Sequence, residues 1–192
     1  MRAATRSGAL PRKSRPLALE FVVPDPSLIV MVGAAGSGKS TFAERHFEAS
    51  EILSSDRFRA VVSGDETDQS ATRGAFSLLH RELDRRLAAG SLTVVDATNV
   101  QRSARRALLV RAHATKTPAI AIILDLQPAT VLARNADRGR VVDATVVRRH
   151  LAQLRASLDG SEPVIEGEGF VRIVVLRDSA DIDRVRISRT PR

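Results

Sequence analysis

The 192-residue sequence contains no cysteine, tyrosine or tryptophan, and only six phenylalanines. Without cysteine there is no disulfide, no thiolate metal site and no thiol nucleophile, which fits a cytoplasmic protein. With so few aromatic side chains, a base-stacking platform of the single-strand-binding type has little to be built from. No stretch approaches the ~20 apolar residues that span a bilayer, so no membrane association is expected.

Acidic residues are outnumbered by basic ones, 22 against 30, which gives a formal charge of +8. The cations are nearly all arginine, because the lysines are only Lys13, Lys39 and Lys116. Arginine suits bidentate phosphate recognition, but an arginine- and alanine-rich composition also follows from genomic base composition. Charge alone therefore identifies no nucleic-acid partner. Residues 1–16 hold five cations and no acid, which predicts a disordered basic arm.

Beyond this arm, short apolar runs alternate with longer helical patterns. The runs rich in valine and isoleucine predict strands of a parallel sheet covered on both faces. The expected strands are 28–32, 51–54, 92–95, 119–124 and 172–176. The expected helices are 42–47, 56–62, 76–87, 104–114, 129–138 and 144–158, the last with Asp143 as its N-cap. A folded domain is expected over residues 17–178, with a loop at 160–169, followed by a C-terminal tail at 179–192.

A glycine-rich run follows the first expected strand and precedes a helical segment. It reads Gly33-Ala34-Ala35-Gly36-Ser37-Gly38-Lys39-Ser40-Thr41 and has the pattern of a phosphate-binding loop. Its glycines let backbone N–H groups face phosphates. The lysine would reach the β- and γ-phosphates, and the serine hydroxyl would ligate Mg²⁺. The glycine spacing does not fit a dinucleotide loop, so the run predicts binding of a nucleoside triphosphate.

Two acidic residues stand at the carboxyl ends of expected strands, where ligands bind in doubly wound folds. Asp56 either accepts a proton from an alcohol that attacks the γ-phosphate or caps the helix 56–62. Arg59, three residues on, either holds an anionic acceptor or pairs with a surface acid. Asp96 resembles the aspartate that holds Mg²⁺ in P-loop proteins, although acids are also common strand terminators.

Arg134 and Arg138 lie four residues apart on one expected helix, so they would face the same way. With the glycine that follows, they are either a mobile lid that stabilises charge on the transferred phosphate or a solvated basic face. Thr98 and Asn99 would position the acceptor or buttress the loop. The four histidines have no metal-ligand spacing, and Gly64–Asp68 reads as a loop.

Together these motifs resemble the 5′-hydroxyl polynucleotide kinase domain of bacterial polynucleotide kinase–phosphatase RNA-repair proteins, in the adenylate-kinase-like branch of P-loop phosphotransferases. The resemblance runs from about residue 17 to 177 and rests on residues 32–43, 54–59, 65–69, 92–101 and 134–138. It implies an α/β P-loop NTPase fold, a three-layer sandwich with a mostly parallel five-stranded sheet and a small helical lid. It also implies ATP as phosphate donor, Mg²⁺, and 5′-OH ends of RNA or DNA as acceptor.

The resemblance implies roles for individual residues as well. Lys39 and Ser40 would hold phosphates and Mg²⁺, Asp56 would be the general base, and Arg59 would contact the acceptor-strand phosphate. Arg134 and Arg138 would clamp the donor nucleotide.

One departure is that the sequence shows neither a metallophosphatase set nor a nucleotidyl-transfer lysine motif. Two alternatives stay open. One is a small-molecule kinase acting on a sugar acid, nucleoside or antibiotic hydroxyl with the same residues. The other is a non-catalytic ATP-binding module, against which the presence of a base and lid arginines counts.

Overall fold

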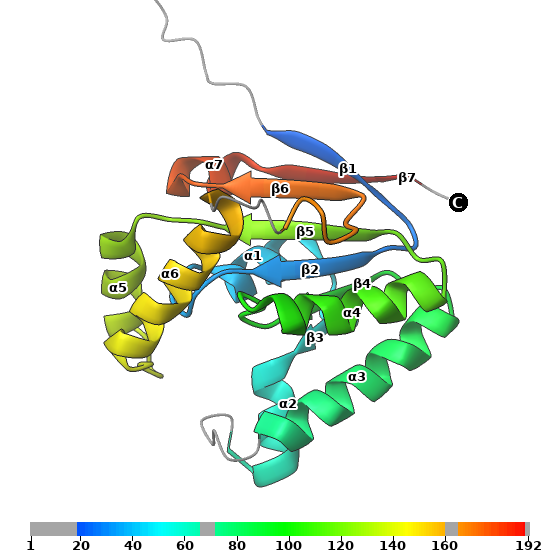
Figure 1. Ribbon diagram of the computed structural model, residues 1–192, viewed down its shortest axis with the longest axis horizontal. Coiled ribbons are helices and arrows are strands. Elements are labelled where there is room, and N and C mark those ends of the chain that lie inside the picture. Colours follow the sequence, from blue (N-terminus) through cyan, green and yellow to red (C-terminus); the bar gives the residue numbers. More distant parts are fainter. Residues whose placement is uncertain (1–18, 66–71, 160–164, 191–192) are drawn as a thin grey trace, which may run out of the picture.

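A five-stranded, all-parallel sheet in the order β3-β4-β2-β5-β6 forms the centre of the molecule (Figure 1). The computed structural model describes residues 19–65, 72–159 and 165–190. The strands of this sheet are β2 (Leu28–Val32), β3 (Ile52–Ser54), β4 (Thr93–Asp96), β5 (Ala119–Leu124) and β6 (Arg172–Leu176). All five predicted strands are therefore confirmed, with ends that differ by at most one residue.

The strands are apolar because helices cover both faces of the sheet. Every residue of β2 and β5 is buried, and successive side chains point to opposite faces. Ile29 and Met31 belong to one core, whereas Leu28 and Val30 belong to the other. Because the strands are parallel, their carboxyl ends meet at one edge, and the polar residues that follow β2, β3 and β4 gather there.

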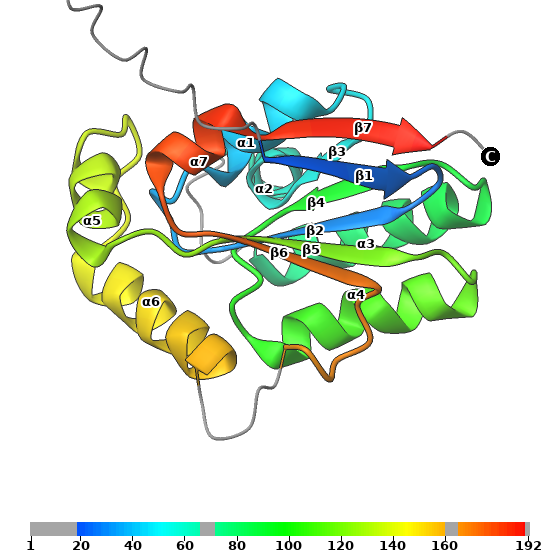
Figure 2. The same ribbon diagram turned by 90° about the horizontal axis from the view of Figure 1, so that it is seen from above.

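The helices divide between the two cores (Figure 2). α1 and α7 pack on one face of the sheet, α3 and α4 on the other, and α6 contributes Val147 and Leu151 to the first core and Leu154 to the second. The helices are α1 (Lys39–His46), α2 (Ser55–Ser63), α3 (Thr72–Ala88), α4 (Arg102–Ala114), α5 (Pro128–Ala136), α6 (Ala144–Asp159) and α7 (Ser179–Arg184). Asp143 caps α6 as predicted, since its Oδ1 accepts the Thr145 N–H at 2.8 Å.

A second, two-stranded parallel sheet pairs the beginning of the described chain with its end. It consists of β1 (Glu20–Pro24) and β7 (Arg186–Thr190). Most of the range expected as a C-terminal tail, 179–192, thus forms α7 and β7. Arg189 of β7 makes two hydrogen bonds, of 2.7 and 2.8 Å, to the Glu51 carboxylate, and Phe21 and Val23 of β1 join the core around α1.

Three expectations fall on residues outside the described ranges. The basic arm, 1–16, is one, and most of the motif at 65–69 and the first part of the loop at 160–169 are the others. In the part of the chain that is described, no helix combines the length and the apolar character needed to cross a membrane.

Candidate active site

The glycine-rich loop turns between the end of β2 and the start of α1. Gly36 and Gly38 have φ angles of 83° and 95°, left-handed conformations that glycine adopts without strain. Gly38 is the N-cap of α1, and no side chain caps the helix there. The N–H groups of the first helical turn are therefore available to an anion, at the positive end of the helix dipole.

Gly36 is also required by close packing between this loop and α5. A Cβ atom at this position would lie 2.5 Å from the backbone oxygen of Val131 and 3.0 Å from Cβ of Asn135. The contact with the Val131 oxygen is closer than real Cβ atoms approach, and it is to backbone, which cannot rotate away. The glycine-rich loop and α5 are thus packed backbone to backbone.

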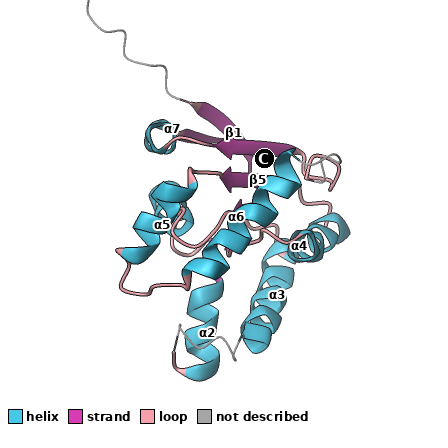
Figure 3. Ribbon diagram, turned by 60° about the vertical axis from the view of Figure 1, so that its left-hand side comes forward, coloured by secondary structure: helices cyan, strands magenta, loops and turns pink. Residues whose placement is uncertain are grey.

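A cavity of about 950 Å³ lies at the carboxyl edge of the sheet, lined by the glycine-rich loop, α2, the end of β4, the α5–α6 region and α7. Figure 3 shows α5 and α6 standing beside this edge. Seven cationic side chains and four carboxylates line it, so its charge suits anionic ligands. The cationic ones are Lys39, Arg45, Arg59, Arg134, Arg138, Arg140 and Arg149, and the acidic ones are Asp56, Asp96, Asp143 and Asp183.

Lys39 is, with Arg59, one of the two buried cations among the described residues that line the cavity. Its Nζ donates a hydrogen bond to the backbone oxygen of Ala34 at 2.9 Å, across the loop that it belongs to. Burial lowers the pKa of its ammonium group to about 8, and Arg138 adds to that effect, whereas Asp96 and Asp56 act in the opposite direction. The negative charge of a phosphate bound beside Lys39 would favour the protonated form of its ammonium group.

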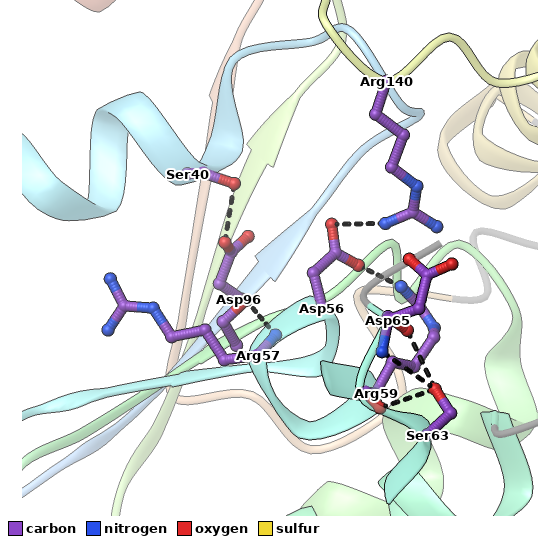
Figure 4. A network of polar contacts seen from close by, with 9 residues as sticks. Ser40, Asp56, Arg57, Arg59, Ser63, Asp65, Asp96 and Arg140 are labelled. Atoms are coloured by element: carbon purple, nitrogen blue, oxygen red, sulfur yellow. Dashed lines mark hydrogen bonds and ion pairs between the residues drawn. The ribbon is translucent and has the colours of Figure 1, made fainter. Parts of the chain in front are cut away.

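Ser40 and Asp96 meet beside the loop, as Figure 4 shows. The Ser40 hydroxyl donates to Oδ2 of Asp96 at 2.7 Å, and Asp96 is the last residue of β4, paired in register with Ser54 of β3. Mg²⁺ prefers oxygen ligands and is commonly held by one or two protein oxygens together with substrate phosphates. This pair fits such a site, and the described residues contain no larger group of His, Asp or Glu side chains that could hold a metal.

Asp56 lies in the first turn of α2 and is not its cap. The N-cap is Ser54, whose hydroxyl accepts the Arg57 N–H at 3.5 Å, so the capping alternative for Asp56 is wrong. The two carboxylate oxygens each meet a guanidinium. Arg59 donates to Oδ1, and Nη1 of Arg140 lies 3.1 Å from Oδ2 (Figure 4).

Arg134 and Arg138 both line the cavity, but they do not share a helix as predicted. α5 ends at Ala136, and Arg138 lies in the turn beyond it. The physical reason is Asn135, whose side chain exchanges two hydrogen bonds with the backbone of Val142 and so draws the chain back. Arg134 donates to the Ser179 hydroxyl of α7 at 3.0 Å.

Thr98 and Asn99 buttress the glycine-rich loop, one of their two expected roles. The Thr98 backbone oxygen accepts the Gly33 N–H at 3.0 Å, and the Asn99 side chain donates to the backbone oxygen of Met31 at 2.9 Å. Asn99 has a φ of 48°. Its backbone oxygen accepts from Arg105, which is itself fully buried.

Arg105 was not singled out in the sequence and is the largest fully buried side chain among the described residues. It makes a bidentate ion pair with Glu168, with contacts of 2.8 and 2.6 Å, and also donates to the backbone oxygens of Asn99 and Val100. The loop after β4 is thereby tied to the segment that leads into β6. A run of arginines on a helical pattern gave no signal that one of them would be buried.

Arg140, Arg149 and His150 also line the cavity without having been singled out as site residues. Burial lowers the pKa of His150, and the positive charges of Arg149 and Lys39 lower it further. It is therefore a neutral side chain near pH 7. Arg149 and His150 sit on the polar face of an amphipathic helix, where sequence alone gives no distinction between a solvated face and a cavity wall.

The sequence of this protein matches the model of a known protein family. The model of the AAA domain family matches residues 28–161, which include the glycine-rich loop, Asp56, Asp96 and the α5–α6 region. A search of curated protein sequences finds no significant match.

Solved structures share the fold at low sequence identity. A chain of the Pnkp1/Rnl/Hen1 RNA repair complex matches at 20% identity and a TM-score of 0.57, over 78% of this chain and 48% of that chain. This protein therefore spans about half the length of that chain. A gluconokinase from Sinorhizobium meliloti 1021 matches at 20% identity and a TM-score of 0.53, over 84% and 87% of the two chains. Chaetomium thermophilum Kti12 in complex with ADP-AlF3 matches at 18% identity and a TM-score of 0.57, over 81% and 93%. The family match covers most of the chain, so the chain belongs to the AAA domain family.

Proposed function

We propose that this protein transfers the γ-phosphate of ATP to a hydroxyl group, and that the acceptor is the 5′-OH end of RNA or DNA. The observation that carries the proposal is the placement of the Asp56 carboxylate in the same cavity as the phosphate-binding loop, Lys39 and Ser40. A module that only binds nucleotide has no need of a general base in this cavity, and the cations around Asp56 suit an anionic acceptor.

The donor half of the site would consist of the glycine-rich loop and the lid arginines. Residues 33–41 would hold the phosphates through backbone N–H groups, and Lys39 would lie against the β- and γ-phosphates. Arg134 and Arg138 would reach the phosphates from the α5 side. Ser40 and Asp96 would hold Mg²⁺, which when bound neutralises charge on the β- and γ-oxygens.

The acceptor half would be built on α2. Asp56 would accept the proton of the attacking hydroxyl, whose oxygen would displace the γ-phosphate in line. Arg59 lies three residues on, pairs with Asp56 and is nearly buried. It would orient the base and contact a phosphate of the acceptor strand, which favours an anionic polymer over a neutral sugar.

The polynucleotide acceptor is further supported by the excess of cations over carboxylates in the cavity. ATP with Mg²⁺ accounts for part of that positive charge, and an acceptor that carries its own phosphates accounts for the rest. The fold shared with a chain of an RNA repair complex is compatible with this choice, as the fold shared with a gluconokinase is compatible with a small acceptor.

The test is transfer of labelled phosphate from γ-labelled ATP to 5′-OH oligonucleotides of RNA and DNA, beside a panel of sugar acids, nucleosides and aminoglycosides. Labelling of oligonucleotides in preference to the panel is the expected result. Labelling of a small molecule alone would overturn the polynucleotide acceptor and leave the kinase reaction in place.

Two variants test the roles of the α2 residues. Asp56→Ala should keep ATP binding and lose transfer by about 10²- to 10⁴-fold, the usual contribution of a general base. Arg59→Ala should raise the KM for the oligonucleotide more than the KM for ATP. Arg57→Ala is the matched control, because that side chain is exposed on the same helical turn and makes only a 3.7 Å ion pair with Glu44.

A further inference from the structure

The ion pair between Arg140 and Asp56 joins the two halves of the cavity. Asp56 belongs to α2, on the acceptor side, and Arg140 belongs to the connection between α5 and α6, on the lid side. Nη1 of Arg140 lies 3.1 Å from Oδ2 of Asp56, and the Arg140 side chain is 21% exposed. Figure 4 shows the Arg140 side chain reaching down from its loop to the carboxylate.

The segment that carries Arg140 is a loop whose two ends are joined by hydrogen bonds between Asn135 and Val142. Asn135 donates to the Val142 backbone oxygen at 2.7 Å and accepts the Val142 N–H at 3.2 Å, and its residue is 3% exposed. α5 in turn packs against Gly36 of the phosphate-binding loop. These hydrogen bonds anchor the loop at Val142, two residues from Arg140, and so keep the loop that carries Arg140 beside the glycine-rich loop.

Each oxygen of Asp56 already has a guanidinium partner, so a hydroxyl that approaches this carboxylate must share an oxygen with an arginine or displace it. Arg59 is on the same helix as Asp56 and only 11% exposed, so its contact is local and persists. The Arg140 contact crosses the cavity and is the one that can be released. A triphosphate offers more negative charge and more acceptor oxygens than one carboxylate, and guanidinium binds such groups bidentately.

We infer that Arg140 exchanges partners during the catalytic cycle, from Asp56 in the nucleotide-free protein to a phosphate of the bound donor. This inference rests on the proposed function. Donor binding then releases Oδ2 of Asp56 from Arg140, so the acceptor hydroxyl meets an unshared oxygen only when there is a phosphate to transfer. Arg140 is in this sense a positioning residue that couples the donor and acceptor sites.

The exchange makes a quantitative prediction about donor affinity. In the wild-type protein, part of the binding free energy of the nucleotide is used to break the Arg140–Asp56 pair. Asp56→Asn removes the charge that competes for Arg140, so it should tighten binding of the donor. It also removes general repulsion between Asp56 and the phosphates, which would act whether or not Arg140 is present.

A double-mutant cycle separates the two effects. The dissociation constant of adenylyl imidodiphosphate with Mg²⁺ is measured by calorimetry for wild type, Asp56→Asn, Arg140→Gln and the double variant. Arg140→Gln should weaken binding about 10-fold. Asp56→Asn should tighten binding about 3- to 10-fold more in the wild-type background than in the Arg140→Gln background, the range expected for a partly exposed charge pair.

Equal effects of Asp56→Asn in both backgrounds would overturn the exchange, as would an Arg140→Gln variant that binds the analogue as tightly as wild type. Arg140→Lys is the second variant, because it keeps the charge and should retain part of the coupling. Melting temperatures without nucleotide show that each variant is folded.

The cycle uses no acceptor, so its outcome is independent of the acceptor assay. Coupling without oligonucleotide phosphorylation would support the exchange and reject the polynucleotide acceptor. Oligonucleotide phosphorylation without coupling would reject the exchange and leave the proposed function standing.

Discussion

Replacing Lys39 with methionine should stabilise the nucleotide-free protein while abolishing its response to ATP. Lys39 is 8% exposed, and burial lowers the pKa of its ammonium group from 10.5 to about 8. Since a shift of one pKa unit corresponds to about 1.4 kcal/mol, the ionised side chain destabilises the folded protein by about 3 kcal/mol. Methionine is of similar length and uncharged. Loss of the hydrogen bond to the Ala34 oxygen costs about 1 kcal/mol, so the net gain at pH 7 is about 2 kcal/mol.

The pH dependence of the free energy of unfolding shows whether the charge of Lys39 destabilises the folded protein. Between about pH 8 and pH 10.5 the unfolded chain holds the Lys39 proton and the folded protein has lost it, so the free energy of unfolding rises with pH across that window. Below it both states are protonated and the full cost is present, and above it neither is. Few other groups titrate in this window, because the chain lacks tyrosine and cysteine and its other lysines are only Lys13 and Lys116.

The assay is urea unfolding, followed by circular dichroism, at several pH values from 7 to 10.5 without nucleotide. Wild type should gain about 3 kcal/mol over the range, and Lys39→Met should stay flat. Lys116→Met is the control, because Lys116 is exposed and its variant should follow wild type. A Lys39→Met profile parallel to that of wild type would refute the reasoning, and so would a Lys39→Met protein that ATP still stabilises.

Three further predictions follow from the geometry. Gly36→Ala should remove ATP binding in a titration and lower the melting temperature, because its Cβ would lie 2.5 Å from a backbone oxygen of α5. Gly64→Ala, at a φ of 76° with open space around it, should cost only the strain of about 1–2 kcal/mol, and equal effects would contradict the close packing. Arg105→Met should lower the free energy of unfolding by about 3–5 kcal/mol, because it leaves Glu168 buried without its partner; a loss below about 1 kcal/mol would contradict that role. The affinity for ATP, measured by calorimetry, should fall above about pH 8 as Lys39 loses its proton, and a constant affinity up to pH 10 would show that its charge is not used.

The central sheet was predictable because its strands are buried on both faces. β2 and β5 are apolar at every position, a pattern that is typical of parallel strands covered on both faces. The helices α3 and α6 were predictable for the complementary reason, since each has one apolar stripe. The glycine-rich loop was predictable because its chemistry is local: Gly38, Lys39 and Ser40 act within one turn of the chain.

β1 and β7 were not predictable in this way. β7 has the sequence Arg-Ile-Ser-Arg-Thr, and its side chains are half-buried or exposed, so it lacks the apolar run that signals a strand. It forms because β1, from the other end of the described chain, offers a parallel partner, and because Arg189 reaches Glu51. The sequence near residues 186–190 does not by itself indicate either contact.

The site residues also divide into those that a local sequence pattern identifies and those whose role depends on contacts with distant parts of the chain. Asp56 could be identified because it lies two residues after the end of a short strand, whereas Arg105 gained its role from Glu168, 63 positions away. The end of α5 was placed two residues too far because a side chain, Asn135, closes the turn through Val142. Helical periodicity describes how a segment packs on a sheet and contains no information about a hydrogen bond that ends it.

Much of the cavity's charge is already paired in the protein without substrate. Ser40 donates to Asp96, Asp56 is held by Arg59 and Arg140, and Arg45 is held by Asp183 of α7 at 2.9 Å. A phosphate that enters must exchange partners with groups that already have them, so each binding free energy measured at this site is a difference between two sets of contacts. Single substitutions will therefore mix the loss of a ligand contact with the release of a competing one, and only paired substitutions, such as Asp56 with Arg140, separate the two.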